Sequence, residues 1–323
     1  MENLQRIGEE LVNGCLKGFL DSVSLHKTLK VLVNSDEIRN KTFLCLAANV
    51  VMLLGSVFIF ELGIRPAIEN IGKSLLPDSE TIVNLVYYYL SYFYHVVWIL
   101  PIWIMCYFVS VRWCQDIANL SYEYTTRKRP KQSPMTEAAY GLIVWLFVFL
   151  EVQLLSNIIP YLLNYLVIFL NNASESSSYH IIYNPMLVII FFVTFSSKVL
   201  GFTLGCIMYG WYGFDHYWIA DGKGPDARFQ LIEKRWVYLL GFGLPYGILV
   251  KNTTFFVGYG AYLTLFPLKI IMGSLLGDSL SNSSALKYSQ SPLFRIFKLP
   301  QKLVNICLRH IDLQSKAKGR KKV

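Results

Sequence analysis

Residues 138–170 read AAYGLIVWLFVFLEVQLLSNIIPYLLNYLVIFL and carry a single charge, that of Glu151. An α-helix rises ~1.5 Å per residue and the hydrocarbon core of a bilayer is ~30 Å thick, so ~20 apolar residues in a row can cross it. The alternative is a soluble all-α protein with long core helices, but such helices keep a charged or polar face towards water. The near absence of charge in this segment therefore predicts a helix inside a membrane.

Further apolar blocks lie on both sides of this segment, at 43–64, 82–111, 186–212, 237–250 and 255–276. The whole chain is 54% hydrophobic and only 16% charged, against about 25% charged residues in ordinary globular proteins. We therefore predict an all-α, polytopic helical membrane protein with about six membrane-inserted blocks. Its membrane domain would span 43–276, between a cytosolic N-terminal segment, 1–42, and a basic cytosolic tail, 277–323.

The net charge of +9 comes from Lys and Arg residues that gather in particular segments. They cluster in 1–42, in the segment after the second block, in the segment after the fourth, and in the C-terminal tail, whereas 171–185 holds none and 65–81 only Arg65 and Lys73. Loops rich in Lys and Arg stay in the cytosol. This alternation predicts that both termini are cytosolic, and it explains the basic charge without a nucleic-acid partner.

The fifth block, 237–250, is too short for a full span. As a helix it would reach only ~21 Å of a ~30 Å core, and it contains Gly241, Gly243 and Pro245. We predict one arm of a half-inserted helical hairpin, which turns through 251–254 and returns from Phe255. Gly243 and Gly247, four residues apart, would let it pack closely on other helices.

Two amphipathic helices are also predicted. Within 112–129, Ile117, Leu120 and Tyr124 share one face, and Pro130 would end the helix. Near the N-terminus the same kind of spacing links five residues: Leu4, Ile7, Leu11, Cys15 and Phe19. Each helix either lies on the membrane surface or packs on the protein's own cytosolic face, and the sequence favours neither.

No catalytic motif is present, and the five histidines are scattered. We therefore expect no enzymatic activity, no cofactor and no metal site. Intramembrane charges are costly and usually functional or paired. Glu151 and Lys198 lie near the middle of neighbouring blocks, so an interhelical ion pair would lower the cost of both, while Lys198 could instead extend its stem towards water. Lys251 is a third candidate, at the hairpin tip.

Three segments resemble a known family. They are Val97-Trp98-Ile99-Leu100-Pro101, leading to Gln115-Asp116-Ile117-Ala118; then Trp236, followed by Gly241-Phe242-Gly243-Leu244-Pro245; and Leu265-Phe266-Pro267-Leu268. Their order and spacing resemble the etoposide-induced, autophagy-linked membrane proteins of the endoplasmic reticulum. The bacterial CysZ sulfate permeases, which combine full-length helices with half-inserted hairpins, are similar at a greater distance.

The resemblance implies an endoplasmic-reticulum protein required for macroautophagy, at the maturation of autophagic membranes. We expect a non-enzymatic scaffold or membrane-organising factor. Its expected partners are the lipid bilayer, anionic lipid at the cytosolic face, and other autophagy or reticulum membrane proteins; oligomerisation is left open. The alternative is a CysZ-like anion permease or channel, in which Lys198 and Lys251 would offset the cost of removing an anion from water.

Overall fold

A computed structural model describes residues 2–75, 100–131, 146–174, 180–253 and 255–281, with single residues at 85, 88, 89, 93, 143, 302 and 306. Within these residues every regular element is a helix, which confirms the all-α class. Three helical segments are long and apolar enough to cross a membrane: Leu146–Ile168, Leu187–Ala220 and Val257–Ser281. The first part of the second block, the start of the third and the basic tail lie outside the described residues.

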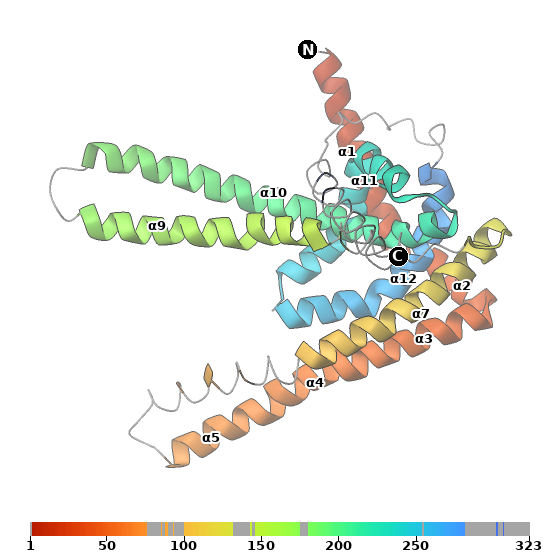
Figure 1. Ribbon diagram of the computed structural model, residues 1–323, viewed down its shortest axis with the longest axis horizontal. Coiled ribbons are helices and arrows are strands. Elements are labelled where there is room, and N and C mark those ends of the chain that lie inside the picture. Colours follow the sequence, from red (N-terminus) through yellow and green to blue (C-terminus); the bar gives the residue numbers. More distant parts are fainter. Residues whose placement is uncertain are drawn as a thin grey trace, which may run out of the picture.

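The N-terminal half is built on one long helical rod. Helices α1 (Glu2–Val23) and α2 (Leu25–Asn34) precede it. The rod itself runs through α3 (Asp36–Asn49), the π-helical η1 (Val50–Leu54), α4 (Gly55–Phe58), η2 (Ile59–Ile64) and α5 (Arg65–Leu75). Helix α7 (Leu100–Thr126) lies antiparallel beside α3 (Figure 1).

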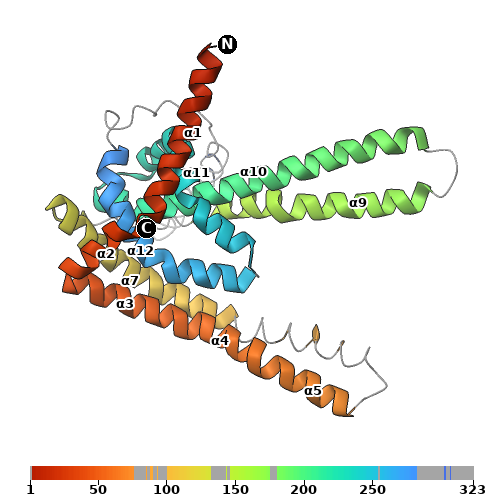
Figure 2. The same ribbon diagram turned by 180° about the vertical axis from the view of Figure 1, so that it is seen from behind.

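Two helical hairpins complete the fold. The first pairs the segment containing η4 (Leu154–Ile158) and α9 (Ile159–Ser174) with α10 (His180–Ala220), and it projects far from the body (Figures 1 and 2). The second pairs α11 (Pro225–Lys251) with α12 (Phe255–Ser281). The most extensive contact between the described helices joins α10 to α11, and the next joins α1 to α11. Helix α11 is therefore central to the body.

The corner between α10 and α11 has a clear local cause. Gly222 adopts a φ of +80°, and the backbone N–H groups of Gly222 and Lys223 donate to the carbonyls of Ile219 and Trp218. This is the Schellman arrangement, in which a left-handed glycine ends a helix. Pro225 then starts α11 at a position where no backbone donor is needed. The chain reverses within a few residues and brings α11 back along α10.

Glycines let α11 approach helices on two sides. A Cβ atom at Gly241 would overlap the carbonyl oxygen of Cys15 on α1, and one at Gly243 would overlap the carbonyl oxygen of Cys206 on α10. Between them the Phe242 side chain is fully buried, with its ring centroid 4.8 Å from that of Phe214. The Gly-Phe-Gly motif thus serves two helix contacts and one core position.

The predicted hairpin is present, but its first arm is not short. Helix α11 begins at Pro225 and has 27 residues, so the predicted start at residue 237 is wrong. Among the described residues, α11 is not one of the segments long and apolar enough to cross a membrane. The charged residues around Glu233 ended the apolar block without ending the helix. In both views the turn after α11 nevertheless stops well short of the far end of α5 and of the ends of α9 and α10 that point the same way (Figures 1 and 2).

The helix predicted at 112–129 is not a separate element. It is the second half of α7, and its residues Ile117 and Ala118 are completely buried in the body. It ends at Thr126, ahead of Pro130, because Arg127 takes up a left-handed φ of 58°. At the N-terminus, Leu11, Cys15 and Phe19 are half-buried on α1. The residues named on each helix therefore pack on the protein itself.

Candidate functional site

The candidate site lies where α12 is disturbed by a proline. Pro267 has no N–H, so the carbonyl of Leu263, four residues earlier, lacks its usual helical donor. Asn49 on α3 replaces that donor, with its Nδ2 3.2 Å from the Leu263 oxygen. Ser110 on α7 donates in turn to Asn49 Oδ1 at 2.9 Å. The Leu-Phe-Pro-Leu motif is therefore held by a buried polar contact among three helices.

Two residues beyond Pro267, the side chain of Lys269 is 0% exposed. Its Nζ has no hydrogen-bond partner among the described residues. Instead it lies 3.6 Å from the ring centroid of Tyr246 and 5.3 Å from that of Phe242, both on α11, and 5.8 Å from that of Tyr262 on α12. The ammonium group is enclosed by aromatic faces.

Glycine makes room for this lysine. A Cβ atom at Gly213 of α10 would lie 2.9 Å from Lys269 Cγ, closer than real side chains approach. One turn further along α12, a Cβ atom at Gly273 would overlap the Gly213 carbonyl oxygen. Helices α10 and α12 therefore meet closely around the lysine stem, and the site is formed jointly by α10, α11 and α12.

The electrostatics of this arrangement are unfavourable for stability alone. A charged group at the centre of a membrane costs at least ~2.5 to 3.5 kcal/mol on the most lenient scale. Contacts with aromatic faces return up to ~2 kcal/mol when desolvated. No carboxylate among the described residues forms an ion pair with Lys269. Burying this charge costs more free energy than its aromatic contacts return. Charged residues kept inside a membrane at such a cost usually have a function, so we treat Lys269 as a candidate functional site.

The predicted Gln-Asp-Ile-Ala motif joins α7 to its neighbours. Gln115 Oε1 lies 3.4 Å from His216 Nδ1 of α10, and Asp116 accepts from Lys41 of α3 at 2.6 Å. Ile117 and Ala118 fill the core. These four residues position helices and do not reach Lys269.

The second motif, on α11, does reach the site. Phe242 forms part of the aromatic enclosure around Lys269. Gly241 and Gly243 set the depth of α11 between α1 and α10, and Trp236, Leu244 and Pro245 are half-buried around them. This motif therefore builds one wall of the candidate site.

The predicted ion pair between Glu151 and Lys198 is not formed. Lys198 is exposed, Glu151 is half-buried, and no contact joins them. The neighbouring Ser197 faces the partner helix instead, and its Oγ donates to the Leu155 carbonyl at 2.6 Å. In a π-helical turn that carbonyl would pair with the residue five positions on, which is Pro160 and has no N–H. The alternative, that Lys198 extends its stem towards water, stays a prediction.

Lys251 is exposed at the end of α11, with its Nζ 4.8 Å from the ring centroid of Phe202. The three charged candidates are thus not brought together, and the sequence reasoning missed the lysine that matters most. A signal was available, because Lys269 is the only charged residue in the block 255–276. It was hidden by its position near the C-terminal end of that block.

The fold and the buried lysine define a multi-helix membrane protein with an intramembrane cation. Residues 24–268 match the family described as Sulfate transporter CysZ/Etoposide-induced protein 2.4, and the chain belongs to this family. Among curated proteins it is 22% identical over 296 residues to the Protein EI24 homolog of Arabidopsis thaliana, covering 79% of this chain and 80% of that one. No solved structure matches the chain. The family predicted from the motifs is therefore confirmed.

Proposed function

We propose that this chain is a non-enzymatic multi-pass protein of the endoplasmic-reticulum membrane, with both termini in the cytosol, that organises autophagic membranes during their maturation. Family membership and the similarity to an EI24 homologue support the proposal. The observation that carries it is the short reach of the α11–α12 hairpin beside the long α9–α10 hairpin (Figure 1). A hairpin that stops inside the bilayer occupies one leaflet more than the other, and such asymmetric insertion favours curved membranes.

The packing of α11 would make this hairpin a rigid wedge. Gly241 and Gly243 bring its backbone against α1 and α10, so the hairpin cannot tilt without losing both contacts. Irregular or shallow helices are tolerated at membrane depth where protein packs around them. The wedge would therefore transmit its shape to the lipid without deforming itself.

Deletion of the gene tests the autophagy role. We expect lipidated autophagosome markers to accumulate and cargo turnover to fall, with recovery on re-expression of the unmodified chain. Re-expression of a Gly243→Leu variant, at matched abundance, should not restore turnover. Normal turnover in the deletion would contradict the role itself, whereas full rescue by Gly243→Leu would contradict the wedge mechanism alone.

The second candidate function is passage of a small anion, and Lys269 is the observation that favours it. A buried ammonium without a carboxylate partner among the described residues offers charge to an entering anion. Sulfate and chloride flux into liposomes containing the purified protein tests this. Flux that Lys269→Met abolishes, and that Lys198→Met leaves intact, would support permeation. Absence of flux through folded protein would contradict anion permeation.

A further inference from the structure

Helix α1 has a second apolar face that points away from the body. Its packing face holds Gly14 and Gly18, and a Cβ atom at Gly18 would overlap the carbonyl oxygen of Tyr238 on α11. The outward stripe consists of residues spaced four, four and three apart, each between 47% and 66% exposed: Val12, Leu16, Leu20 and Val23. This stripe differs from the one that the sequence suggested at Leu11, Cys15 and Phe19.

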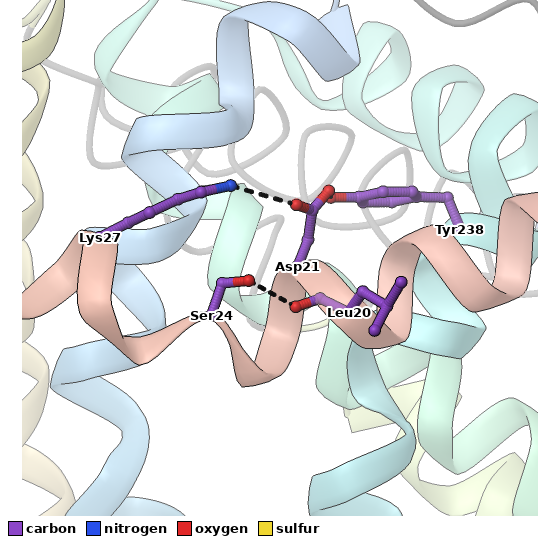
Figure 3. Close-up of polar contacts among 5 residues, drawn as sticks. All are labelled: Leu20, Asp21, Ser24, Lys27 and Tyr238. Carbon is purple, nitrogen blue, oxygen red and sulfur yellow. Dashed lines mark hydrogen bonds and ion pairs between the residues drawn. The ribbon is translucent and has the colours of Figure 1, made fainter.

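The rotation of α1 about its axis is fixed by polar contacts at its C-terminal end (Figure 3). The Asp21 carboxylate accepts from the Tyr238 hydroxyl at 2.9 Å and pairs with Lys27 Nζ at 3.4 Å. Ser24 Oγ donates to the Leu20 carbonyl at 2.7 Å. Because Asp21 anchors α1 to α11, Leu16 and Leu20 are held facing outwards.

Helix α2 continues the pattern. Leu25, Leu29 and Val33 are 48% to 73% exposed, while Thr28 and Val31 are buried against the body. A cation accompanies each stripe, because Lys17 on α1 and Lys30 on α2 are both exposed. Aliphatic side chains on one face with Lys beside them are the composition of helices that lie in a membrane interface.

The orientation of α1 points to the same occupant. In both views α1 runs crosswise to the α9–α10 hairpin (Figures 1 and 2). Among the described residues, that hairpin holds two of the three segments long and apolar enough to span a bilayer. A helix that crosses spanning helices near their base runs along the membrane plane. Its unpartnered apolar face then meets the boundary between headgroups and acyl chains.

We propose that α1 and α2 are in-plane helices that insert their outward aliphatic stripes into the bilayer interface, where Lys17 and Lys30 contact anionic headgroups. This goes beyond the proposed function, since it holds for an organiser and for a permease alike. Asp21 and Tyr238 would couple the depth of the in-plane helices to α11, and so to the hairpin. The proposed occupant of the two stripes is the lipid surface. The test below distinguishes this from contact with a second copy of the chain.

Lipid quenching in the full chain tests this inference. A small environment-sensitive fluorescent amino acid replaces Leu16, and in a matched control it replaces Glu10, which lies about 120° around the helix from Leu16 and has a side chain that is 37% exposed. The protein is reconstituted at low density in phosphatidylcholine vesicles. Nitroxide on the acyl chains should quench the probe at 16 and leave that at 10 unchanged, whereas aqueous iodide should do the reverse. Size-exclusion chromatography checks that both variants are folded.

Two outcomes overturn the insertion. The first is equal quenching by iodide at both positions; the second is shielding at 16 that appears only at high protein density, which would assign the stripe to a second copy. A separate experiment tests the preference for anionic lipid. Added phosphatidylserine should increase lipid quenching at 16, and Lys17→Gln with Lys30→Gln should abolish that increase. An unchanged signal with phosphatidylserine would overturn the role of the lysines.

Discussion

Asn49 donates a hydrogen bond to the carbonyl of Leu263, the carbonyl that Pro267 deprives of its helical partner. The contact links the N-terminal rod to α12, four residues before Pro267. It shows how a proline can be kept inside a long apolar helix, because a side chain from another helix supplies the missing donor. The same arrangement occurs near Pro160, where Ser197 of α10 donates to the Leu155 carbonyl.

This contact predicts that the effects of substituting Asn49 and Pro267 on stability are not additive. Asn49→Leu should destabilise the protein by about 1 to 3 kcal/mol, because it leaves a buried carbonyl unpaired. Pro267→Ala restores an N–H to α12, so Asn49→Leu should cost clearly less in that background. Thermal unfolding in detergent of the four variants measures the cycle. Equal costs in both backgrounds would mean that the Leu263 carbonyl does not depend on Asn49.

Alanine substitutions at glycines of α11 and of the rod should lower thermal stability by different amounts, in an order that the packing predicts. Gly243→Ala forces a Cβ atom onto the Cys206 backbone, whereas at Gly247 the obstacle is the Cys206 side chain, which can move. Overpacking costs about 1 to 3 kcal/mol. We expect the largest loss of thermal stability for Gly243→Ala, a smaller one for Gly247→Ala, and none for Gly63→Ala, where nothing lies within 4 Å. A Gly243→Ala variant as stable as Gly63→Ala would be incompatible with the close packing of α10 and α11.

Lys269 should weaken the fold that contains it. Lys269→Met keeps an apolar chain of similar length and removes a desolvated charge, so it should stabilise the protein by about 1 to 4 kcal/mol. Lys198→Met, at an exposed position, should change little. Unfolding temperatures of the two variants in the same detergent provide the comparison. A large loss of stability for Lys269→Met would show that the ammonium has a strong anionic partner in the folded protein.

The corner after α10 should respond to pH. Burial raises the pKa of Asp221, but the pairing with Lys223 and the hydrogen bond from Tyr122 outweigh it, so the pKa lies below its ordinary value. A carboxyl with a lowered pKa contributes stability above its unfolded pKa, and this is lost as the pH falls through the folded value. Asp221→Asn should therefore destabilise at neutral pH and much less in acid. Glu9→Gln, on the exposed side of α1, is the control; a pH-independent cost for Asp221→Asn would refute the linkage.

The sequence predicted much of this fold because apolar runs report directly on membrane helices. It predicted the turn after Lys251 and the close packing through Gly243 and Gly247, which lie four residues apart on one helix face and both meet Cys206. It failed at the start of α11, because Glu233, Lys234 and Arg235 interrupt hydropathy but not hydrogen bonding. Leu11, Cys15 and Phe19 of α1 pack on the protein, which is one of the two predicted alternatives. The second, outward stripe was not predicted, because glycines such as Gly14 and Gly18 on the packing face carry no hydropathy signal. Lys269 depends on packing among three helices, which no local pattern records.

Accessibility of the hairpin tip tests the central claim most directly. Thr253→Cys places a thiol in the turn after α11, and Ser177→Cys places one in the segment between the third and fourth blocks. A membrane-impermeant maleimide is applied to each face of sealed reticulum vesicles in turn. The labelling of the unsubstituted chain, which has its own cysteines, is subtracted as background. The account predicts that Ser177→Cys labels from the lumenal face, while Thr253→Cys labels from neither face until detergent dissolves the bilayer. Lumenal labelling of Thr253→Cys as complete as that of Ser177→Cys would contradict a hairpin that stops inside the membrane.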